Sequence, residues 1–296
     1  MADFLSVLVT GVLLGGIYGL VSIGLNLVFG VMRVVNFAHG ELIMISMYAA
    51  YWLFTLAGIN PYVAALIVVP LMFVFGVILQ RFLIQPLQSE HNMQLFATFG
   101  LLILLQNTVL AITTGQAAGI DWQPARQVLT FGDINISLVR LLAFAMATAI
   151  TIGLHFFLRD TLQGKAIRAV IQDKRAARMM GINVERAYLL TFGAASALAG
   201  VAGVLLMPIY TLTPGIGGDF IVAAFAVVVL GGLGSTWGAY IGGLVVGLVE
   251  AFAGYYVDPA LKQAIWFVIF LIVLTVRPSG LLGLVGAEEI GFREQN

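Results

Sequence analysis

Five polar side chains that could handle a substrate or an ion lie in or beside long apolar stretches: Asn26, Asn36, His39, Glu41 and Glu250. Glu250 is the clearest case, because it stands fourteen residues into the apolar run 236–256. A carboxylate inside a membrane is costly, and by default it predicts a site that handles substrate, ions or protons. Two simpler interpretations stay open for Glu250: it reaches the outer membrane interface, or it forms a hydrogen bond between helices. For Asn26, a hydrogen bond that holds helices together is favoured over contact with a substrate.

Metal, nucleophilic and nucleotide chemistry have little support in the sequence. His39 and Glu41 are a weak metal pair, the chain has 3 histidines and no cysteine, and no H-E-x-x-H motif occurs. No G-x-S-x-G nucleophile elbow is present either. Gly164-Lys165 has no glycine five residues before it and is followed by Ala166, so it is not a P-loop. The sequence therefore predicts no enzyme, metal or cofactor, and any energy must come from a partner or an ion gradient.

The composition describes a membrane protein. Hydrophobic residues make up 61% of the 296 residues and charged residues 9%, against about 25% charged residues in an average soluble chain. So few charges cannot cover a water-facing surface, so most of the surface must face lipid. The net charge of zero excludes a polybasic nucleic-acid binder.

The apolar runs predict an all-α protein that crosses the membrane many times. A hydrocarbon layer about 30 Å thick requires roughly 20 helical residues. Eight runs come close to this length: 4–30, 41–58, 62–80, 93–114, 138–158, 188–207, 236–256 and 261–277. The shorter run 219–231 ends in a glycine-rich segment and predicts either a re-entrant half-helix or a short crossing, with Asp219 as its N-cap. We therefore expect eight or nine transmembrane helices.

The basic residues predict the orientation. Seven of the 14 lie in one loop: Arg159, Lys165, Arg168, Lys174, Arg175, Arg178 and Arg186. The positive-inside rule places this loop in the cytoplasm and the 115–137 loop outside, where alternating residues around Gly132 predict a small hairpin. The same rule places Arg277 on the cytoplasmic side. The chain reaches that side at Arg277 only after nine crossings, which favours a crossing at 219–234.

Glycines and polar residues interrupt the apolar pattern in three places: 33–41, 213–219 and 231–234. Helix breaks at membrane depth are tolerated where they line an enclosed or water-filled cavity. Small residues also recur at four-residue spacing on three predicted helices, as in Gly11/Gly15/Gly19, Gly243/Gly247 and Ser196/Gly200. Such faces let helix backbones approach closely, and packing within the chain is their simplest use.

The cytoplasmic loop predicts two short helices over 161–181. Ile167, Val170 and Ile171 share one helical face, Asp173 can cap a second helix, and Gly181 can end it. Two interpretations stay open. The loop is either an amphipathic helix held by anionic lipid headgroups or a projecting helix that fits a cytosolic partner.

Several segments together resemble a known family. Ala176–Gly181 resembles the Ala-Ala-x-x-x-Gly core of the loop by which ABC-importer permeases dock on their ATPases, although Arg175 stands where Glu is common and the later Leu-Pro is missing. The more specific segments are Gly24–Met32, Val35–Leu42, Ala223–Gly234, Gly238–Gly243, Gly247–Glu250 and Arg277–Leu281. Over nearly the whole chain these resemble the branched-chain amino acid ABC transporter permeases, specifically the shorter subunit of the permease pair.

The resemblance implies a multi-pass permease of the bacterial inner membrane. Its partners would be a second permease subunit, two cytosolic ATPase subunits and a periplasmic solute-binding protein. Its substrates would be leucine, isoleucine and valine, or a related solute such as an amide or urea. One permease domain is expected, with helices over 1–158, the cytoplasmic loop 159–187, helices over 188–277 and a cytoplasmic tail over 278–296.

The resemblance also assigns expected roles. The residues expected to couple the chain to the ATPases are Arg168, Asp173, Lys174, Arg175, Ala177, Arg178 and Gly181. The residues expected along the translocation path are Asn26, Asn36, His39, Glu41 and Glu250. The competing class is an ion-coupled secondary transporter or channel, with Glu250 or Glu41 as its proton or sodium site. The choice among related solutes, and between a distinct second permease and a second copy of this chain, stays open.

Overall fold

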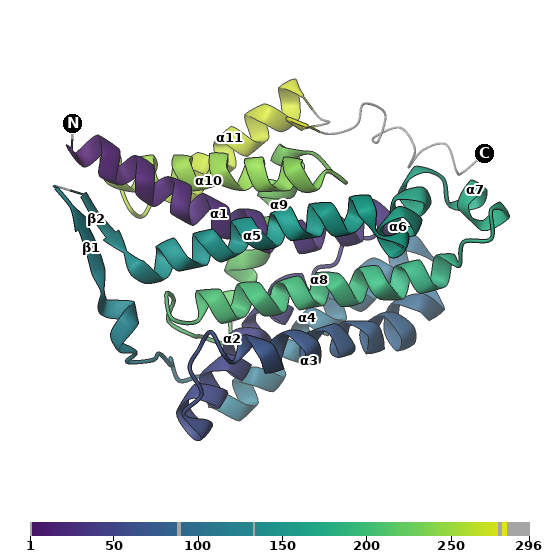
Figure 1. Cartoon of the computed structure of the whole chain (residues 1–296), viewed down its shortest axis with the longest axis horizontal. Helices are drawn as coiled ribbons and strands as arrows, with labels where there is room; N and C mark the ends of the chain where they lie inside the picture. Colours follow the sequence, from purple (N-terminus) through teal and green to yellow (C-terminus); the bar gives the residue numbers. More distant parts are fainter. Residues whose placement is uncertain (1, 88–89, 133, 278–279, 283–296) are drawn as a thin grey trace. The chain divides into compact units, whose positions relative to one another are not determined.

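A computed structural model describes residues 2–87, 90–132, 134–277 and 280–282, and most of these residues are helical (Figure 1). The long helices are α1 (Ala2–Met32), α2 (His39–Ala57), α3 (Ala65–Leu79), α4 (His91–Thr113), α5 (Leu138–Asp160), α8 (Val184–Leu206), α9 (Ile216–Gly231), α10 (Thr236–Tyr256) and α11 (Lys262–Val276). Two short helices, α6 (Leu162–Gln172) and α7 (Lys174–Met179), lie between α5 and α8. The expected tail over 278–296 lies outside the described residues except for 280–282.

The helix lengths confirm the expected class of protein. Within the described residues, 7 helices are long and apolar enough to cross a membrane, where α3 is counted together with the helical turns Gln80–Ile84 and Gln85–Leu87 that continue it. Helices α9 and α11 are shorter apolar helices. Together they match the eight or nine helices expected from the sequence. With 16 residues, α9 rises about 24 Å, somewhat less than the thickness of the hydrocarbon layer.

The predicted N-cap of α9 is wrong. The helix begins at Ile216, so Asp219 lies within its first turn rather than before it. The chain already turns at Thr213, whose carbonyl accepts a hydrogen bond from the Ile216 N–H (3.1 Å). Asp219 still suits its position, because a carboxylate in the first turn of a helix interacts favourably with the helix dipole.

The hairpin predicted around Gly132 is confirmed. Strand β1 (Val128–Phe131) pairs antiparallel with β2 (Ile134–Ser137), with Val128 opposite Ser137. Gly132 adopts a φ of 61° between the strands. Glycine tolerates this left-handed conformation without the steric cost that a side chain would add.

The chain folds into two compact units that are interleaved along the sequence. Unit 1 contains residues up to Asn26, Gln123–Thr151 and the residues from Ala223 onward. Unit 2 contains Leu27–Trp122 and Ile152–Val222. Helices α1, α5 and α9 each begin in one unit and end in the other.

Glycines allow the close packing of α1 on α10 in unit 1. A Cβ added to Gly243 or Gly247 on α10 would collide with the backbone of Gly19 or Gly15 on α1. The opposite face of α10 is equally close to α9, because Gly238 and Gly231 lie against each other's carbonyl groups. The predicted small-residue faces are therefore packing faces within the chain.

The end of α9 is capped by residues that follow the last helix. The N–H of Leu281 donates to the carbonyl of Leu230 (2.8 Å), and the N–H of Leu282 donates to the carbonyl of Gly231 (3.0 Å). These bonds satisfy carbonyl groups that a helix leaves unpaired at its C-terminus. The ends of α9 and α11 therefore lie on the same side, as the nine-crossing topology requires.

In unit 2, α8 packs against α2 and α3. Gly203 on α8 lies against Ser46 and the backbone of α2, while Gly76 on α3 lies against Ser196. Figure 1 shows α3 and α8 running side by side. The close backbone approach replaces the hydrophobic drive that lipid cannot supply.

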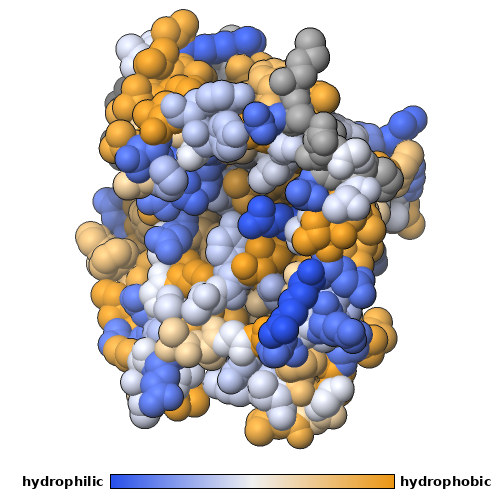
Figure 2. Space-filling model, turned by 90° about the vertical axis from the view of Figure 1, so that its left-hand side faces the viewer, coloured by the Kyte–Doolittle hydropathy of each residue, from blue (hydrophilic) through white to orange (hydrophobic). Residues whose placement is uncertain are grey.

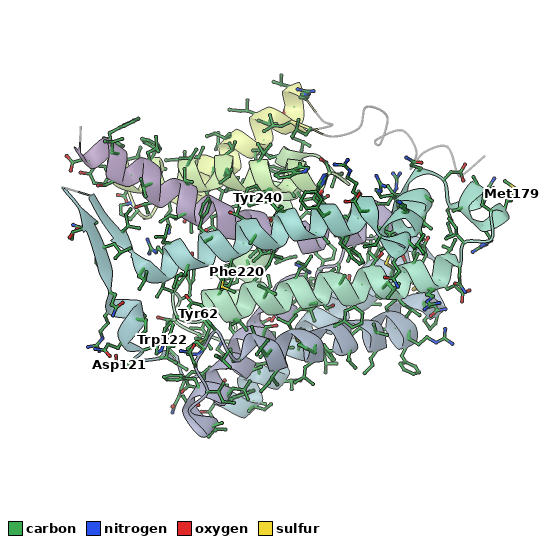
Figure 3. The ribbon with its side chains drawn as sticks, viewed as in Figure 1. Tyr62, Asp121, Trp122, Met179, Phe220 and Tyr240 are labelled. Carbon is green, nitrogen blue, oxygen red and sulfur yellow. The ribbon has the colours of Figure 1, made fainter. Side chains whose placement is uncertain are left out.

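The loops at the opposite end of unit 2 from α6 and α7 also hold together. Ala118 and Leu212 exchange backbone hydrogen bonds of 3.0 and 2.8 Å. The rings of Tyr62 and Trp122 meet edge to face, with centroids 5.2 Å apart (Figure 3). Burial of Tyr62, which precedes α3, raises the pKa of its hydroxyl to about 12. The loops before α3, after α4 and before α9 therefore share one end of unit 2.

Large apolar side chains reach the surface, as expected of helices that face lipid. On α3, on the π-helical turn Gln80–Ile84 that continues it and on α4, these include Leu66, Leu71, Phe82, Phe96 and Leu104. Figure 2 shows hydrophobic residues at the surface beside hydrophilic ones.

Candidate docking loop and buried polar residues

Helix α6 is fixed to the rest of unit 2 by its apolar face. Its N-cap is Thr161, whose hydroxyl accepts a hydrogen bond from the Gly164 N–H (3.0 Å). Gly164 lies against the backbone of Phe157 and Leu158 at the end of α5, where a Cβ would not fit. Ile167 and Val170 are buried in the same apolar cluster as Leu158. The predicted amphipathic helix is therefore folded onto the protein by the face that the sequence indicated.

Helix α7 is held by its caps. The Asp173 carboxylate accepts hydrogen bonds from the N–H groups of Arg175 (2.7 Å) and Ala176 (2.9 Å). Gly181 follows the helix with a φ of 82°, as expected for a glycine that ends a helix. Both predicted roles are confirmed, and they give a helix of only six residues a defined start and end.

The exposed face of α7 combines cations with two methionines. Lys174, Arg175 and Arg178 on α7 are exposed, as are Arg168 on α6 and the flanking residues Asp173 and Gly181. Met179 and Met180 at the end of α7 are 81% and 82% exposed, and Figure 3 places Met179 at the outer end of this helix. The methionines were not among the residues expected to couple the chain to the ATPases. The sequence could have indicated them, because it places two apolar residues at the end of a predicted cationic helix.

Ala177 differs from the other expected coupling residues. It is only 4% exposed and belongs to the apolar cluster that includes Val184 and Tyr188. Its methyl group therefore anchors α7 to α8 and is not presented to a partner.

Polar contacts also connect the loop to the neighbouring helices. Arg168 donates a hydrogen bond to the carbonyl of Arg159 (3.0 Å), and the Lys174 ammonium lies 5.4 Å from the centre of the Tyr188 ring on α8. Beside them, Gln85 donates to Glu185 at the start of α8 (3.3 Å). A displacement of α6 and α7 would therefore reach α8 through Lys174 and Tyr188, and the Gln85–Glu185 hydrogen bond joins α8 in turn to the segment that follows α3.

Asn26 holds the glycine-rich turn of unit 1. Its amide nitrogen donates to the carbonyl of Ser235 (2.6 Å), and its amide oxygen accepts from the N–H of Gly234 (2.7 Å). One side chain on α1 thus satisfies two backbone groups between α9 and α10, which agrees with the favoured interpretation of Asn26.

Glu250 has partners on two other helices. The Tyr18 hydroxyl of α1 donates to Glu250 Oε2 (2.7 Å), and the Lys262 ammonium at the start of α11 lies 3.0 Å from Oε1. The Glu250 side chain is 7% exposed and that of Lys262 is 42% exposed. The geometry therefore matches the hydrogen-bond interpretation of Glu250, in which this carboxylate joins α1, α10 and α11.

Asn36, His39 and Glu41 surround the break between α1 and α2, and each is 1% exposed. The Asn36 side chain accepts a hydrogen bond from the Ala38 N–H (3.1 Å), which shapes the turn before α2. His39 and Glu41 lie in the first turn of α2. The Glu41 carboxylate lies against Gly217, in the first turn of α9.

Comparison with known proteins gives matches over nearly the full chain. Residues 7–274 match the family described as branched-chain amino acid transport system / permease component. The chain is 33% identical over 305 residues to the high-affinity branched-chain amino acid transport system permease protein BraD of Pseudomonas aeruginosa, covering 97% of this chain and 98% of the relative. It is 32% identical over 308 residues to LivH of Escherichia coli K12, with the same coverage. A probable LivH of Methanocaldococcus jannaschii is 29% identical over 283 residues, covering 90% of this chain and 88% of the relative. No solved structure matches the chain.

Proposed function

Because this chain belongs to the branched-chain amino acid transport system permease family, we propose that it forms the translocation path for leucine, isoleucine and valine in an ATP-driven importer. It is a transport subunit of the inner membrane and not an enzyme. Cytosolic ATPase subunits would supply the energy, and a periplasmic binding protein would deliver the substrate. We further propose that this chain pairs with a second permease subunit and that the pair binds two ATPase subunits.

The projecting helix α7 is the observation that carries the proposal. Its cations and methionines are exposed, while Ala177 fixes it to the apolar core of unit 2. An amphipathic helix lying on lipid would instead bury its apolar side chains in the membrane interface. The apolar face of α6 is already buried within the protein. The exposed cations of α7, together with Met179 and Met180 at its end, are therefore available to a cytosolic partner.

The proposed coupling runs through α8. Closure of the ATPase dimer would displace α6 and α7, and the contact of Lys174 with Tyr188 and the burial of Ala177 against α8 would pass this displacement to α8. Since α8 packs closely on α2 and α3, its movement would rearrange the helix break that holds Asn36, His39 and Glu41. We propose that these three residues line the path, whereas Asn26 and Glu250 hold the helices of unit 1 in position.

The test is uptake of radiolabelled leucine into proteoliposomes that contain this chain, its partner permease, the two ATPases and the binding protein. Uptake should require ATP and persist after ionophores have removed all ion gradients. Uptake by this chain alone, driven by a sodium or pH gradient, would instead establish the secondary-transporter alternative.

Docking is tested separately by a variant that carries Arg175→Glu, Arg178→Glu and Gly181→Trp. Reversed charges and a bulky residue at the end of α7 should reduce uptake about tenfold or more, while the chain still inserts into the membrane. Wild-type uptake by this variant would contradict the docking of α7 on the ATPase.

A further inference from the structure

Glu41 is a buried carboxylate that lacks the partners usual for its kind. It is 1% exposed, and its Oε2 atom forms no hydrogen bond with any residue that the structure describes. Nor does any described Lys or Arg form an ion pair with it. A buried carboxylate of this kind is unfavourable unless a hydrogen-bond donor or a cation compensates it. Glu250 has both kinds of partner in Tyr18 and Lys262, which makes the difference at Glu41 informative.

The position of Glu41 is a junction of two helix N-termini in unit 2. Glu41 lies in the first turn of α2, and a Cβ added to Gly217 in the first turn of α9 would lie 2.7 Å from Glu41 Oε1. Gly40 lies directly against the Gly217 carbonyl. The partial positive charge at each helix N-terminus stabilises a carboxylate placed there. Two helix N-termini, and no described basic side chain, therefore face this carboxylate.

Space remains beside this junction. A Cβ added to Gly218 would have no heavy atom within 4 Å, and one added to Gly215 would meet only the Gln106 amide at 3.8 Å. Gly215 itself is exposed. Gly217 is therefore tightly packed against Glu41, whereas Gly215 and Gly218 on either side of it have room for a side chain.

We propose that Glu41 binds the α-ammonium group of the transported amino acid at the junction of α2 and α9. An ammonium group has three N–H donors, and a carboxylate oxygen without a partner is the acceptor that such a donor requires. The N–H groups of a helix N-terminus suit the α-carboxylate of the same zwitterion. This inference rests on the proposed function and identifies the substrate as an amino acid with a free ammonium group, as opposed to an amide or urea.

The first experiment measures ATP-driven leucine uptake by the complete complex in proteoliposomes. Glu41→Gln keeps the shape of the side chain and removes its charge, so uptake should fall about tenfold or more. Glu41→Asp keeps the charge and should retain more uptake than Glu41→Gln. The matched control is Glu90→Gln, which makes the same change at an exposed position before α4 and should leave uptake unchanged.

The second experiment separates ligand binding from a structural role. If Glu41 only stabilised the fold, Glu41→Gln would lower the melting temperature of the detergent-solubilised complex. A carboxylate reserved for substrate predicts little change in melting temperature, because the variant loses the interaction with two helix N-termini but also removes a buried charge whose Oε2 atom has no hydrogen bond within the described residues. In addition, 3-methylbutylamine, which carries the leucine side chain on an ammonium group, should raise the melting temperature of the wild type but not of Glu41→Gln.

Three results would overturn the inference: uptake unaffected by Glu41→Gln, an equal effect of the amine on both proteins, or stabilisation by sodium chloride and not by the amine. The proposed function fails in a different way, since the wild-type complex would then not import leucine with ATP at all.

Discussion

Replacing Glu250 by Gln should destabilise unit 1, because this carboxylate joins three helices. The variant removes the ion pair with Lys262 but keeps an oxygen that can accept the Tyr18 hydroxyl hydrogen bond. Breaking a fully buried ion pair costs about 3–5 kcal/mol. The Lys262 side chain is 42% exposed, so water compensates much of its charge once Glu250 is neutral. We therefore expect a loss of about 1–2 kcal/mol in the free energy of unfolding.

The assay is reversible unfolding of the purified chain in micelles by titration with a denaturing detergent. A double-mutant cycle with Glu250→Gln and Lys262→Met should give a coupling energy of about 1 kcal/mol that decreases as salt is added. The control Glu90→Gln should change stability by less than about 0.5 kcal/mol, as surface substitutions usually do. The reasoning is refuted if Glu250→Gln behaves like Glu90→Gln, or if it abolishes uptake without any loss of stability.

Two further predictions concern packing and docking. Gly243→Val on α10 should lower the free energy of unfolding by about 1–3 kcal/mol, because the valine side chain would collide with the backbone of Gly19. Gly153→Ala on α5 is the control, because a Cβ there has no neighbour within 4 Å. It should raise the free energy of unfolding by up to about 1 kcal/mol through helix propensity. Unfolding of the two variants in micelles measures both values, and an unchanged stability of Gly243→Val would contradict the close packing of α1 on α10. The double variant Met179→Asp/Met180→Asp should weaken binding of the ATPase subunits about tenfold, as measured by co-purification. Leu162→Asp, at an equally exposed position of α6, should leave this binding unchanged. Equal binding by both variants would show that the methionines do not contact the ATPase.

Much of the fold follows from local signals in the sequence. Membrane-spanning helices are recognisable because roughly 20 consecutive apolar residues suffice to identify one. The helix caps at Asp173 and Gly181 were predictable for a similar reason. The Asp173 side chain and the Gly181 backbone each cap a helix end that lies within a few residues in the sequence. The start of α9 was not predictable in this way, because the turn at Thr213 begins the helix before Asp219 is reached.

The roles of the polar residues depended on the tertiary structure. Glu41 and Glu250 look alike in the sequence, as single carboxylates in apolar surroundings. Folding brings Tyr18, 232 residues away, to Glu250, while it places Glu41 against the first turn of α9. The partners of a buried charge come from distant segments, so no local pattern records them. The sequence alone determined the membrane-spanning class, the approximate positions of the helices and the two short helices over 161–181. Only the tertiary structure decided that Glu250 pairs with Tyr18 and Lys262, while Glu41 Oε2 has no partner among the described residues.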